Sequence, residues 1–134
     1  MSDANAAVIR GIYDAFAAGD GPGALGRMSP DIVWNEAESH PWADGNPYVG
    51  PNAVAEGIFA RCATEWDGFS VRVDDLLASG DKVIMLGRYG GTCKATGLTQ
   101  NTQVVHVWDV RGGKAVRFQQ YVDTLQLSRV MGLI

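Results

Sequence analysis

The chain has 134 residues, of which 46% are hydrophobic and 19% are charged, and its formal net charge is −4. This length fits one domain of ordinary size, so we expect a single domain over residues 1–134, with enough apolar residues to fill a core and line a cavity. Lys and Arg number 11 and are scattered singly, which argues against a nucleic-acid partner, because binding phosphates needs a concentrated basic surface.

The first 20 residues do not resemble a secretion signal, because Asp3, Arg10 and Asp14 interrupt the apolar residues. The longest apolar stretch is far below the roughly 20 residues that a membrane span requires. Cys62 and Cys93 lack the spacing of a metal site, and we expect both to be free, buried thiols in a reducing compartment. The sequence therefore predicts a cytoplasmic protein without a membrane segment.

The first part of the chain has helical spacing. Apolar residues three or four apart predict a helix from about residue 3 to residue 18, and Gly19 favours a left-handed stop. Asp20 is a candidate cap for a short helix that runs through Leu25 and Met28 and ends before Pro30. Residues 32–34 predict a brief strand. A long helix is expected from Pro51, with one stripe formed by Val54, Ile58, Cys62 and Trp66.

Residues 35–50 form the least regular segment of the sequence. They contain two prolines, two glycines, two aromatic residues, His40 and three acids, without any period. A loop of this length inside a compact domain is uncommon, and such loops are more often functional than not.

From residue 69 onward the apolar period changes to two, which is typical of strands. Turns are expected at residues 79–81 and 96–97, and Arg111-Gly112-Gly113-Lys114 is a strong hairpin motif. Helices followed by a run of hairpins indicate an α+β domain, in which a curved meander packs against the helices.

The order of these elements resembles the nuclear transport factor 2-like superfamily, and within it the group of SnoaL-like polyketide cyclases and ketosteroid isomerases. The likeness covers nearly the whole chain and rests on six segments: Ala18-Gly19-Asp20, Ile32 to Asn35, Gly50 to Ala53, Val105 to Trp108, Gly112-Gly113-Lys114, and Phe118 to Tyr121 with Asp123. It implies a cone in which a strongly curved antiparallel sheet wraps the N-terminal helices. It also implies an internal, mostly apolar pocket for a hydrophobic small molecule.

Members of this group usually pair through the outer face of the sheet, so the resemblance implies a homodimer. By strand parity the inner face carries Val104, His106, Trp108, Phe118, Gln120 and Val122. The outer face carries Val105, Val107, Gln119 and Tyr121. That outer set is half apolar, which suits a covered interface better than open water.

The resemblance also implies positions for the three catalytic groups of ketosteroid isomerases, and none of them matches. The base position falls on Asn35, the tyrosine position falls on Ile12, and the second oxyanion donor falls on His106. Tyr13 is one residue from the tyrosine position and so about 100° around the helix. An amide is too weak a base to take a proton from carbon, which excludes steroid isomerisation by that triad unless a neighbouring acid substitutes.

His106 interrupts an otherwise apolar strand face, so its imidazole is expected to point into the cavity, where burial favours the neutral form. Two interpretations stay open: a general acid/base or oxyanion donor, and a core histidine tied to a neighbouring group.

Glu36 is the acid that we expect to replace the missing base, beside Trp34 in a medium of low dielectric constant. Asn35 points to the other side and is expected to orient the substrate. The sequence leaves open which of these two sides faces the cavity. Glu38 and Asp44 are expected to be solvated loop acids. Glu36, Glu38 and His40 alternate as in a facial metal site, but nothing completes the set at a recognisable spacing, and we expect neither a metal nor a cofactor.

Asp123 stands where a SnoaL-like cyclase carries a pocket acid, but parity places it on the outer face, and we expect a helix cap. The predicted catalytic residues are therefore His106, Glu36 and Asn35, and the predicted substrate-binding residues are Trp34, Trp108, Phe118, Gln120 and Tyr13. Together they predict a cofactor-independent, isomerase- or cyclase-like enzyme that transfers protons on a cyclic or polyketide-like compound. The alternative is a non-catalytic ligand-binding or dimeric scaffold module of the same fold.

Overall fold

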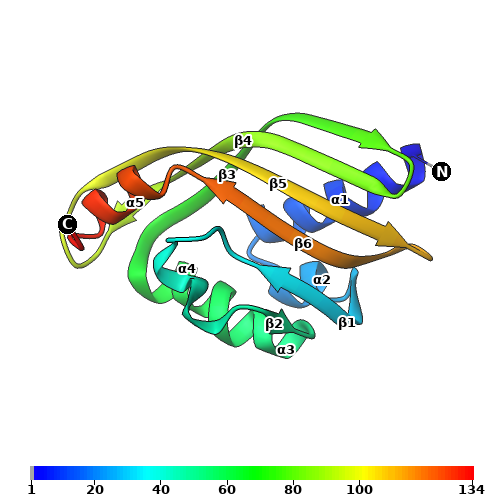
Figure 1. Cartoon of the computed structure of the whole chain (residues 1–134), viewed down its shortest axis with the longest axis horizontal. Helices are drawn as coiled ribbons and strands as arrows, with labels where there is room; N and C mark the ends of the chain where they lie inside the picture. The colour runs from blue at the N-terminus through cyan, green and yellow to red at the C-terminus, as the bar shows by residue number, and fades with distance from the viewer. Residues whose placement is uncertain (1) are drawn as a thin grey trace.

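The computed structural model describes residues 2–134, which contain one curved sheet of six strands in the order β2-β1-β6-β5-β4-β3 (Figure 1). The strands are β1 (Met28–Asn35), β2 (Tyr48–Val49), β3 (Trp66–Ser79), β4 (Lys82–Cys93), β5 (Thr99–Arg111) and β6 (Lys114–Val122). The hairpin predicted at residues 111–114 joins β5 to β6, with Arg111 opposite Lys114. The α+β fold class predicted from the sequence is confirmed.

One strand pair departs from the expected antiparallel sheet, because β1 runs parallel to β6. Parallel neighbours need a long crossover connection, and here the chain passes through two helical segments and four strands before it returns beside β1. All the other strand pairs are antiparallel.

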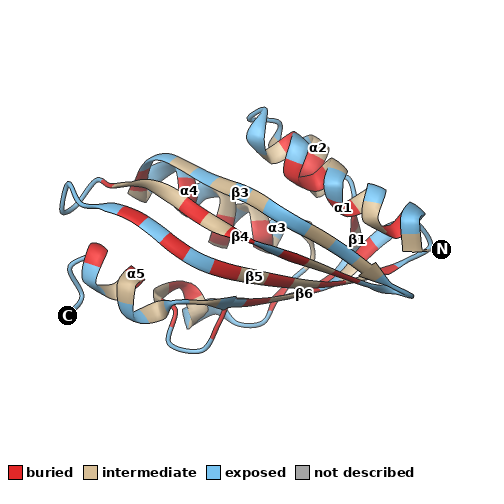
Figure 2. Ribbon diagram, turned by 90° about the horizontal axis from the view of Figure 1, so that it is seen from above, coloured by how far each residue is buried: buried red, intermediate tan, exposed pale blue. Residues whose placement is uncertain are grey.

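Helix α1 (Ser2–Ala17) packs against β3, β4 and β5 and closes one side of the sheet (Figures 1 and 2). It ends at Gly19, whose φ of 74° is left-handed, as the sequence predicted. Helix α2 (Gly21–Leu25) follows, and the side chain of Asp20 accepts a hydrogen bond from the backbone N of Gly23 at 2.9 Å. Both the helix stop and the cap are confirmed.

The short helix ends earlier than expected, because Met28 is already the first residue of β1, opposite Ala115 of β6. Pro30 therefore lies inside a strand and does not end a helix. The register of β1 against β6 shifts between Met28 and Val33, so no regular ladder hydrogen bond is required from the proline nitrogen.

The long helix begins at Pro51, as predicted, and consists of α3 (Pro51–Val54), a π-helical turn (Ala55–Phe59) and α4 (Ala60–Glu65). Trp66 does not belong to its stripe. It is extended, begins β3 opposite Cys93, and is buried. A spacing of four residues does not show whether a buried residue belongs to the last turn of a helix or to the start of the next strand.

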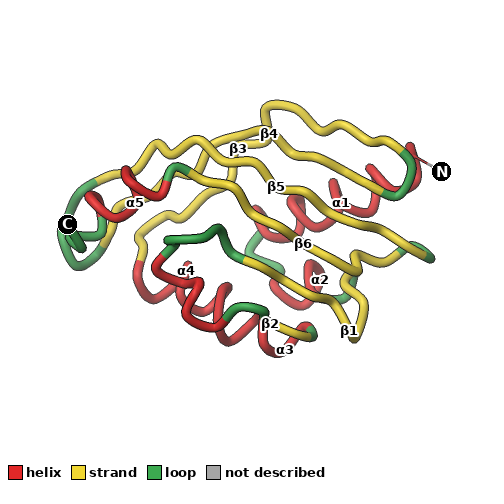
Figure 3. Tube along the Cα trace, in the orientation of Figure 1, coloured by secondary structure: helices red, strands yellow, loops and turns green. Residues whose placement is uncertain are grey.

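The segment at residues 35–50 is more ordered than its composition predicted. It contains a 3-10 helix (Pro41–Gly45) and the short strand β2, which pairs with β1 (Figure 3). Helix α5 (Thr124–Val130) ends the chain, and Asp123 caps it by accepting a hydrogen bond from the backbone N of Gln126. The cap interpretation of Asp123 is confirmed.

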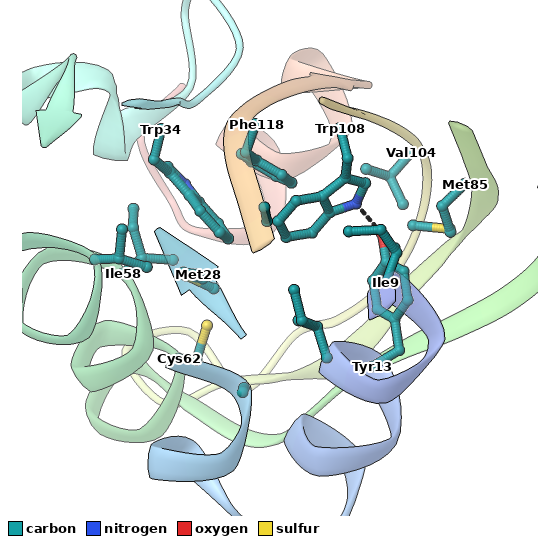
Figure 4. Packing of buried hydrophobic residues seen from close by; sticks show 14 of the residues in the cluster. Ile9, Tyr13, Met28, Trp34, Ile58, Cys62, Met85, Val104, Trp108 and Phe118 are labelled. Carbon is teal, nitrogen blue, oxygen red and sulfur yellow. Dashed lines mark hydrogen bonds between the residues drawn. The ribbon is translucent and has the colours of Figure 1, made fainter. Parts of the chain in front are cut away.

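The core lies between the concave face of the sheet and the helices. Buried and exposed residues alternate along β5, which is visible in Figure 2 and follows the predicted parity. Trp34, Trp108 and Phe118 pack together at the centre of the core (Figure 4). Cys62 and Cys93 are both buried and free. Among residues 2–134, no helix combines the length and the apolar character needed to cross a bilayer.

Candidate functional site

An internal cavity of about 50 Å³ lies between the sheet, α1 and the helices that follow β2. Its volume holds a few water molecules, since one water needs roughly 10–15 Å³. Most of the lining is apolar or aromatic. The predicted site residues that line it are Tyr13, Trp34, Glu36, His106, Trp108 and Gln120.

A surface depression of about 410 Å³ adjoins this cavity. The two spaces share five lining residues, Phe16, Phe59, Cys62, Trp66 and Phe69. The rings of Phe59 and Phe69 each contact Phe16 edge-on, with centroid distances of 5.3 and 6.1 Å, and these three rings form a wall between the two spaces. The π-helical turn carries Phe59 into this wall. Such turns occur frequently at functional sites.

His106 is the centre of the first polar group in the cavity. Its Nδ1 lies 2.7 Å from the hydroxyl of Tyr13, and its Nε2 lies 2.6 Å from the hydroxyl of Tyr89. Both ring nitrogens are therefore occupied by phenols, and the polar atoms that remain for a ligand are the two hydroxyls.

Each phenol also accepts a hydrogen bond from an N–H group. Trp108 Nε1 donates to Tyr13 at 2.8 Å (dashed line in Figure 4), and Gln120 Nε2 donates to Tyr89 at 2.7 Å. The Oε1 of Gln120 accepts from the backbone N of Ala37 at 3.1 Å. Gln120 thus ties the chain just after Glu36 to the group around His106.

Burial keeps this first group uncharged. The loss of solvation lowers the pKa of His106 to about 3, because the imidazolium form is disfavoured inside the protein. Burial likewise raises the pKa of Tyr13 and of Tyr89 above the ordinary value of 10. At neutral pH the three side chains are a neutral imidazole between two neutral phenols.

Glu36 is the second polar group, and it is 2% exposed. Trp34 Nε1 donates to its Oε2 at 3.0 Å, while Asn46 exchanges two hydrogen bonds with its backbone. Within residues 2–134 its Oε1 receives no hydrogen bond, and His40 Nε2 lies 3.9 Å from it. Burial raises the pKa of Glu36 to about 7, although the bond from Trp34 opposes this shift.

His40 has a fixed tautomer, because its Nδ1 accepts a hydrogen bond from the backbone N of Trp42 at 2.9 Å. The proton of the neutral ring is therefore on Nε2, the atom that faces Glu36. Burial and the charge of Arg61 lower the pKa of His40 to about 4, so the ring is neutral beside Glu36. The 3.9 Å between them is too long for a direct hydrogen bond.

The raised pKa of Glu36 predicts a pH-dependent cost to stability. The ordinary pKa is 4.5 and the folded value is about 7, so the contribution of Glu36 is complete below pH 4.5 and is lost as the pH rises through 7. Relative to the parent, the neutral variant Glu36→Gln should gain about 2–3 kcal/mol between pH 5 and pH 9. Urea unfolding of both proteins at both pH values measures this gain. An equal difference at the two pH values would contradict the raised pKa.

Two predicted site residues lie outside the cavity lining. Asn35 pairs opposite Gln119 and is partly exposed, because β1 continues through it and parity turns its side chain away from Trp34 and Glu36. Phe118 is fully buried behind the lining, with its ring stacked on Trp34 at a centroid distance of 3.6 Å. Phe118 supports Trp34 from behind but is not itself part of the cavity surface.

The loop acids lie where the sequence placed them. Glu38 is exposed, and the exposed carboxylate of Asp44 forms an ion pair with Arg61 at 3.1 Å, which lowers the pKa of Asp44. In the part of the chain that the structure describes, no three His, Cys, Asp or Glu side chains gather as metal ligands.

Sequence reasoning missed two residues of the site. Tyr89 lies in the region predicted to form strands and has no predicted role, although parity with Val83 and Met85, both buried, places it on the inner face. His40 was considered only as a metal ligand. Its place before a proline and a tryptophan, at the start of a 3-10 helix, is the local signal for a capping side chain.

Comparison with known proteins agrees with this fold. The model of the SnoaL-like domain matches residues 9–118. An NTF2-like protein from Burkholderia thailandensis is 34% identical, with 95% of this chain and 96% of that chain covered and a TM-score of 0.90. An NTF2-like protein of unknown function from Burkholderia pseudomallei is 29% identical, with 98% of each chain covered and a TM-score of 0.87.

A third solved structure is that of TerC co-crystallized with polyporic acid. It is 27% identical, 96% of this chain and 98% of that chain are covered, and the TM-score is 0.86. Among curated proteins, none matches this chain. The match to the domain model spans most of the sequence, and the structural matches span nearly all of it. The chain therefore belongs to the family of SnoaL-like domains and has the NTF2-like cone fold.

Proposed function

We propose that this protein is a cofactor-independent enzyme that transfers protons on a small, hydrophobic, cyclic or polyketide-like carbonyl compound. The observation that carries the proposal is Glu36, a buried carboxyl group with one oxygen free of hydrogen bonds and a pKa of about 7, in an apolar cavity. A pKa near the working pH is what a group needs in order to take a proton and return it.

The two polar groups have complementary roles in this proposal. Glu36 takes a proton from a carbon next to the carbonyl and returns it elsewhere on the substrate. A hydroxyl beside His106 donates a hydrogen bond to the oxygen that gains negative charge. His106 therefore acts through Tyr13 and Tyr89, because both of its nitrogens already contact them. Trp34 and Trp108 supply flat surfaces for a ring.

Entry of a ring-shaped compound requires a movement, because the cavity has room for only a few waters. We place this movement at Phe16, Phe59 and Phe69, because these three rings line both the cavity and the outer depression. The similarity to TerC, whose structure contains polyporic acid, supports a small organic ligand for this fold.

Proton transfer can be tested without knowing the product. Cyclic ketones, enones and polyketide-like rings are incubated with the protein in heavy water, and deuterium uptake next to the carbonyl is followed by NMR. The proposal expects uptake well above the buffer rate for at least one ring class. If a compound binds well but takes up no deuterium at any pH, the enzyme proposal is contradicted and the alternative, a non-catalytic ligand-binding module, is supported.

We also propose that two copies pair through the outer face of the sheet. Leu86, Val105 and Tyr121 lie side by side on β4, β5 and β6, and Leu86 and Tyr121 are 36% and 56% exposed. A row of apolar residues on a sheet face is more stable when it is covered.

Sedimentation at micromolar concentration should therefore give about twice the 14.3 kDa of one chain. Leu86→Glu should give a monomer, because a charge would be buried in the interface. Leu98→Glu is the matched control, since Leu98 is exposed in a turn away from this row. A monomeric parent protein would contradict the interface and leave the cavity proposal standing.

A further inference from the structure

The polar group around His106 contains one more proton than its internal contacts use. Two of the surrounding hydrogen bonds have a fixed direction. Trp108 can only donate, so Tyr13 accepts from it. The Oε1 of Gln120 faces the backbone N–H of Ala37, which fixes the amide orientation, so its Nε2 donates to Tyr89.

The remaining two contacts join His106 to Tyr13 and to Tyr89. A neutral imidazole carries one N–H and each phenol carries one O–H, which gives three protons. Each contact needs one proton. One hydroxyl proton is therefore left over in either tautomer, and residues 2–134 offer no further acceptor to either hydroxyl.

The tautomer of His106 decides which tyrosine holds the spare proton. When Nδ1 is protonated it donates to Tyr13, Tyr89 donates to Nε2, and the O–H of Tyr13 is free. When Nε2 is protonated it donates to Tyr89, Tyr13 donates to Nδ1, and the O–H of Tyr89 is free. In both states the tyrosine with the free O–H already accepts two N–H donors.

We propose that Tyr13, His106 and Tyr89 form a tautomer relay, which presents a single O–H donor to the cavity and moves it between the two tyrosines. Because the oxygen of the presenting hydroxyl is saturated as an acceptor, the site selects a ligand with an acceptor oxygen, such as the carbonyl of a ketone or an enone. Both phenols line the cavity, so either position can meet that oxygen.

The relay conserves protons. In the first state, Tyr13 gives its free proton to the ligand oxygen, the proton on Nδ1 moves to the oxygen of Tyr13, and the proton of Tyr89 moves to Nε2. To complete the relay the ligand carries a hydroxyl beside its carbonyl, as in the enol form of a β-diketone, and the proton of that hydroxyl arrives on the oxygen of Tyr89. The result is the second tautomer, with one proton taken from the ligand at one end and one returned at the other.

This inference rests on the proposed function for its substrate class, but the state of His106 can be read without turnover. The chain contains only two histidines, so ¹⁵N-labelled histidine gives a simple NMR spectrum in which the two ring nitrogens report the tautomer. His40 is the internal control, since the backbone of Trp42 holds it in the Nε2–H form.

Tyr13→Phe and Tyr89→Phe should shift the tautomer equilibrium of His106 in opposite directions. Without Tyr13, a proton on Nδ1 would have no acceptor, so the Nε2–H form should predominate. Without Tyr89, the Nδ1–H form should predominate for the same reason. The parent should lie between these limits, while His40 stays unchanged in all three proteins. The same tautomer in both variants, or a doubly protonated His106 at neutral pH, would overturn the relay.

Acetophenone and α-methylstyrene test the ligand class, because they share a shape and differ in the acceptor oxygen. The parent should bind acetophenone about three- to tenfold more tightly, the usual net effect of one hydrogen bond, and acetophenone should move His106 toward one tautomer. The double variant Tyr13→Phe/Tyr89→Phe should lose this preference. Equal binding of the two compounds by the parent, or no change at His106 on binding acetophenone, would overturn the preference.

The two proposals fail separately. If the tautomers respond as expected and no ring compound ever takes up deuterium, the relay stands and the enzyme proposal fails. If Glu36→Gln abolishes deuterium uptake while His106 keeps one tautomer in every variant, the enzyme proposal stands and the relay fails.

Discussion

Glu36→Gln should lower the rate of proton transfer by roughly two to four decades, the usual contribution of a placed acid or base. The amide keeps the shape of the side chain and can still accept from Trp34, but it cannot take up a proton. The rate is measured as deuterium uptake into the best compound of the ring screen. In the parent the rate should rise with pH through about 7, the pKa of Glu36, because only the carboxylate is a base.

Glu38→Gln is the matched control, because it makes the same change two residues away on an exposed side chain. Its rate should equal that of the parent. His106→Ala should also lower the rate by two to four decades, since it removes the group that links the two phenols. The double variant with Glu36→Gln should lose little more than the worse single variant, because groups that act together are not additive. A Glu36→Gln protein with full activity would refute the role of Glu36.

Strand parity explains why much of the site was predictable. Side chains alternate between the two faces of a strand, so the sequence shows which of them share a face even when the neighbouring strands are unknown. His106, Trp108 and Gln120 were assigned to the inner face in this way. The same rule linked Trp34 to Glu36 and separated them from Asn35. What remained open was which of those two sides faces the cavity, because this depends on the neighbours of β1 in the sheet.

The partners of His106 were harder to predict. Tyr13 lies 93 residues away in sequence, and although it was among the predicted substrate-binding residues, no contact with His106 was predicted for it. Tyr89 is four residues along β4 from Met85, the residue that pairs with His106, and only the curvature of the sheet brings its hydroxyl to the imidazole. Parity also states the side of a residue but not whether another ring covers it, which is why Phe118 was expected at the cavity surface.

Phe118→Ala should destabilise the fold by about 3–5 kcal/mol, the usual cost of removing a buried phenylalanine ring. The ring is fully buried, stacks on Trp34, and contacts His106 and Trp108 edge-on, each with a centroid distance of 4.7 Å. Urea unfolding gives the change in the free energy of unfolding, and Leu98→Ala, at an exposed turn, should change it by less than about 0.5 kcal/mol.

A loss below about 1 kcal/mol in Phe118→Ala would mean that the neighbouring rings collapse into the space. That outcome has a second consequence, because Trp34 holds Oε2 of Glu36 through its indole N–H. If Trp34 shifts and water enters beside it, the desolvation that raises the pKa of Glu36 is relieved, and this pKa should fall from about 7 toward 4.5. Titration of the Glu36 carboxyl carbon by NMR in Phe118→Ala therefore measures whether Phe118, which contributes nothing to the cavity surface, sets the basicity of the carboxyl group inside the cavity.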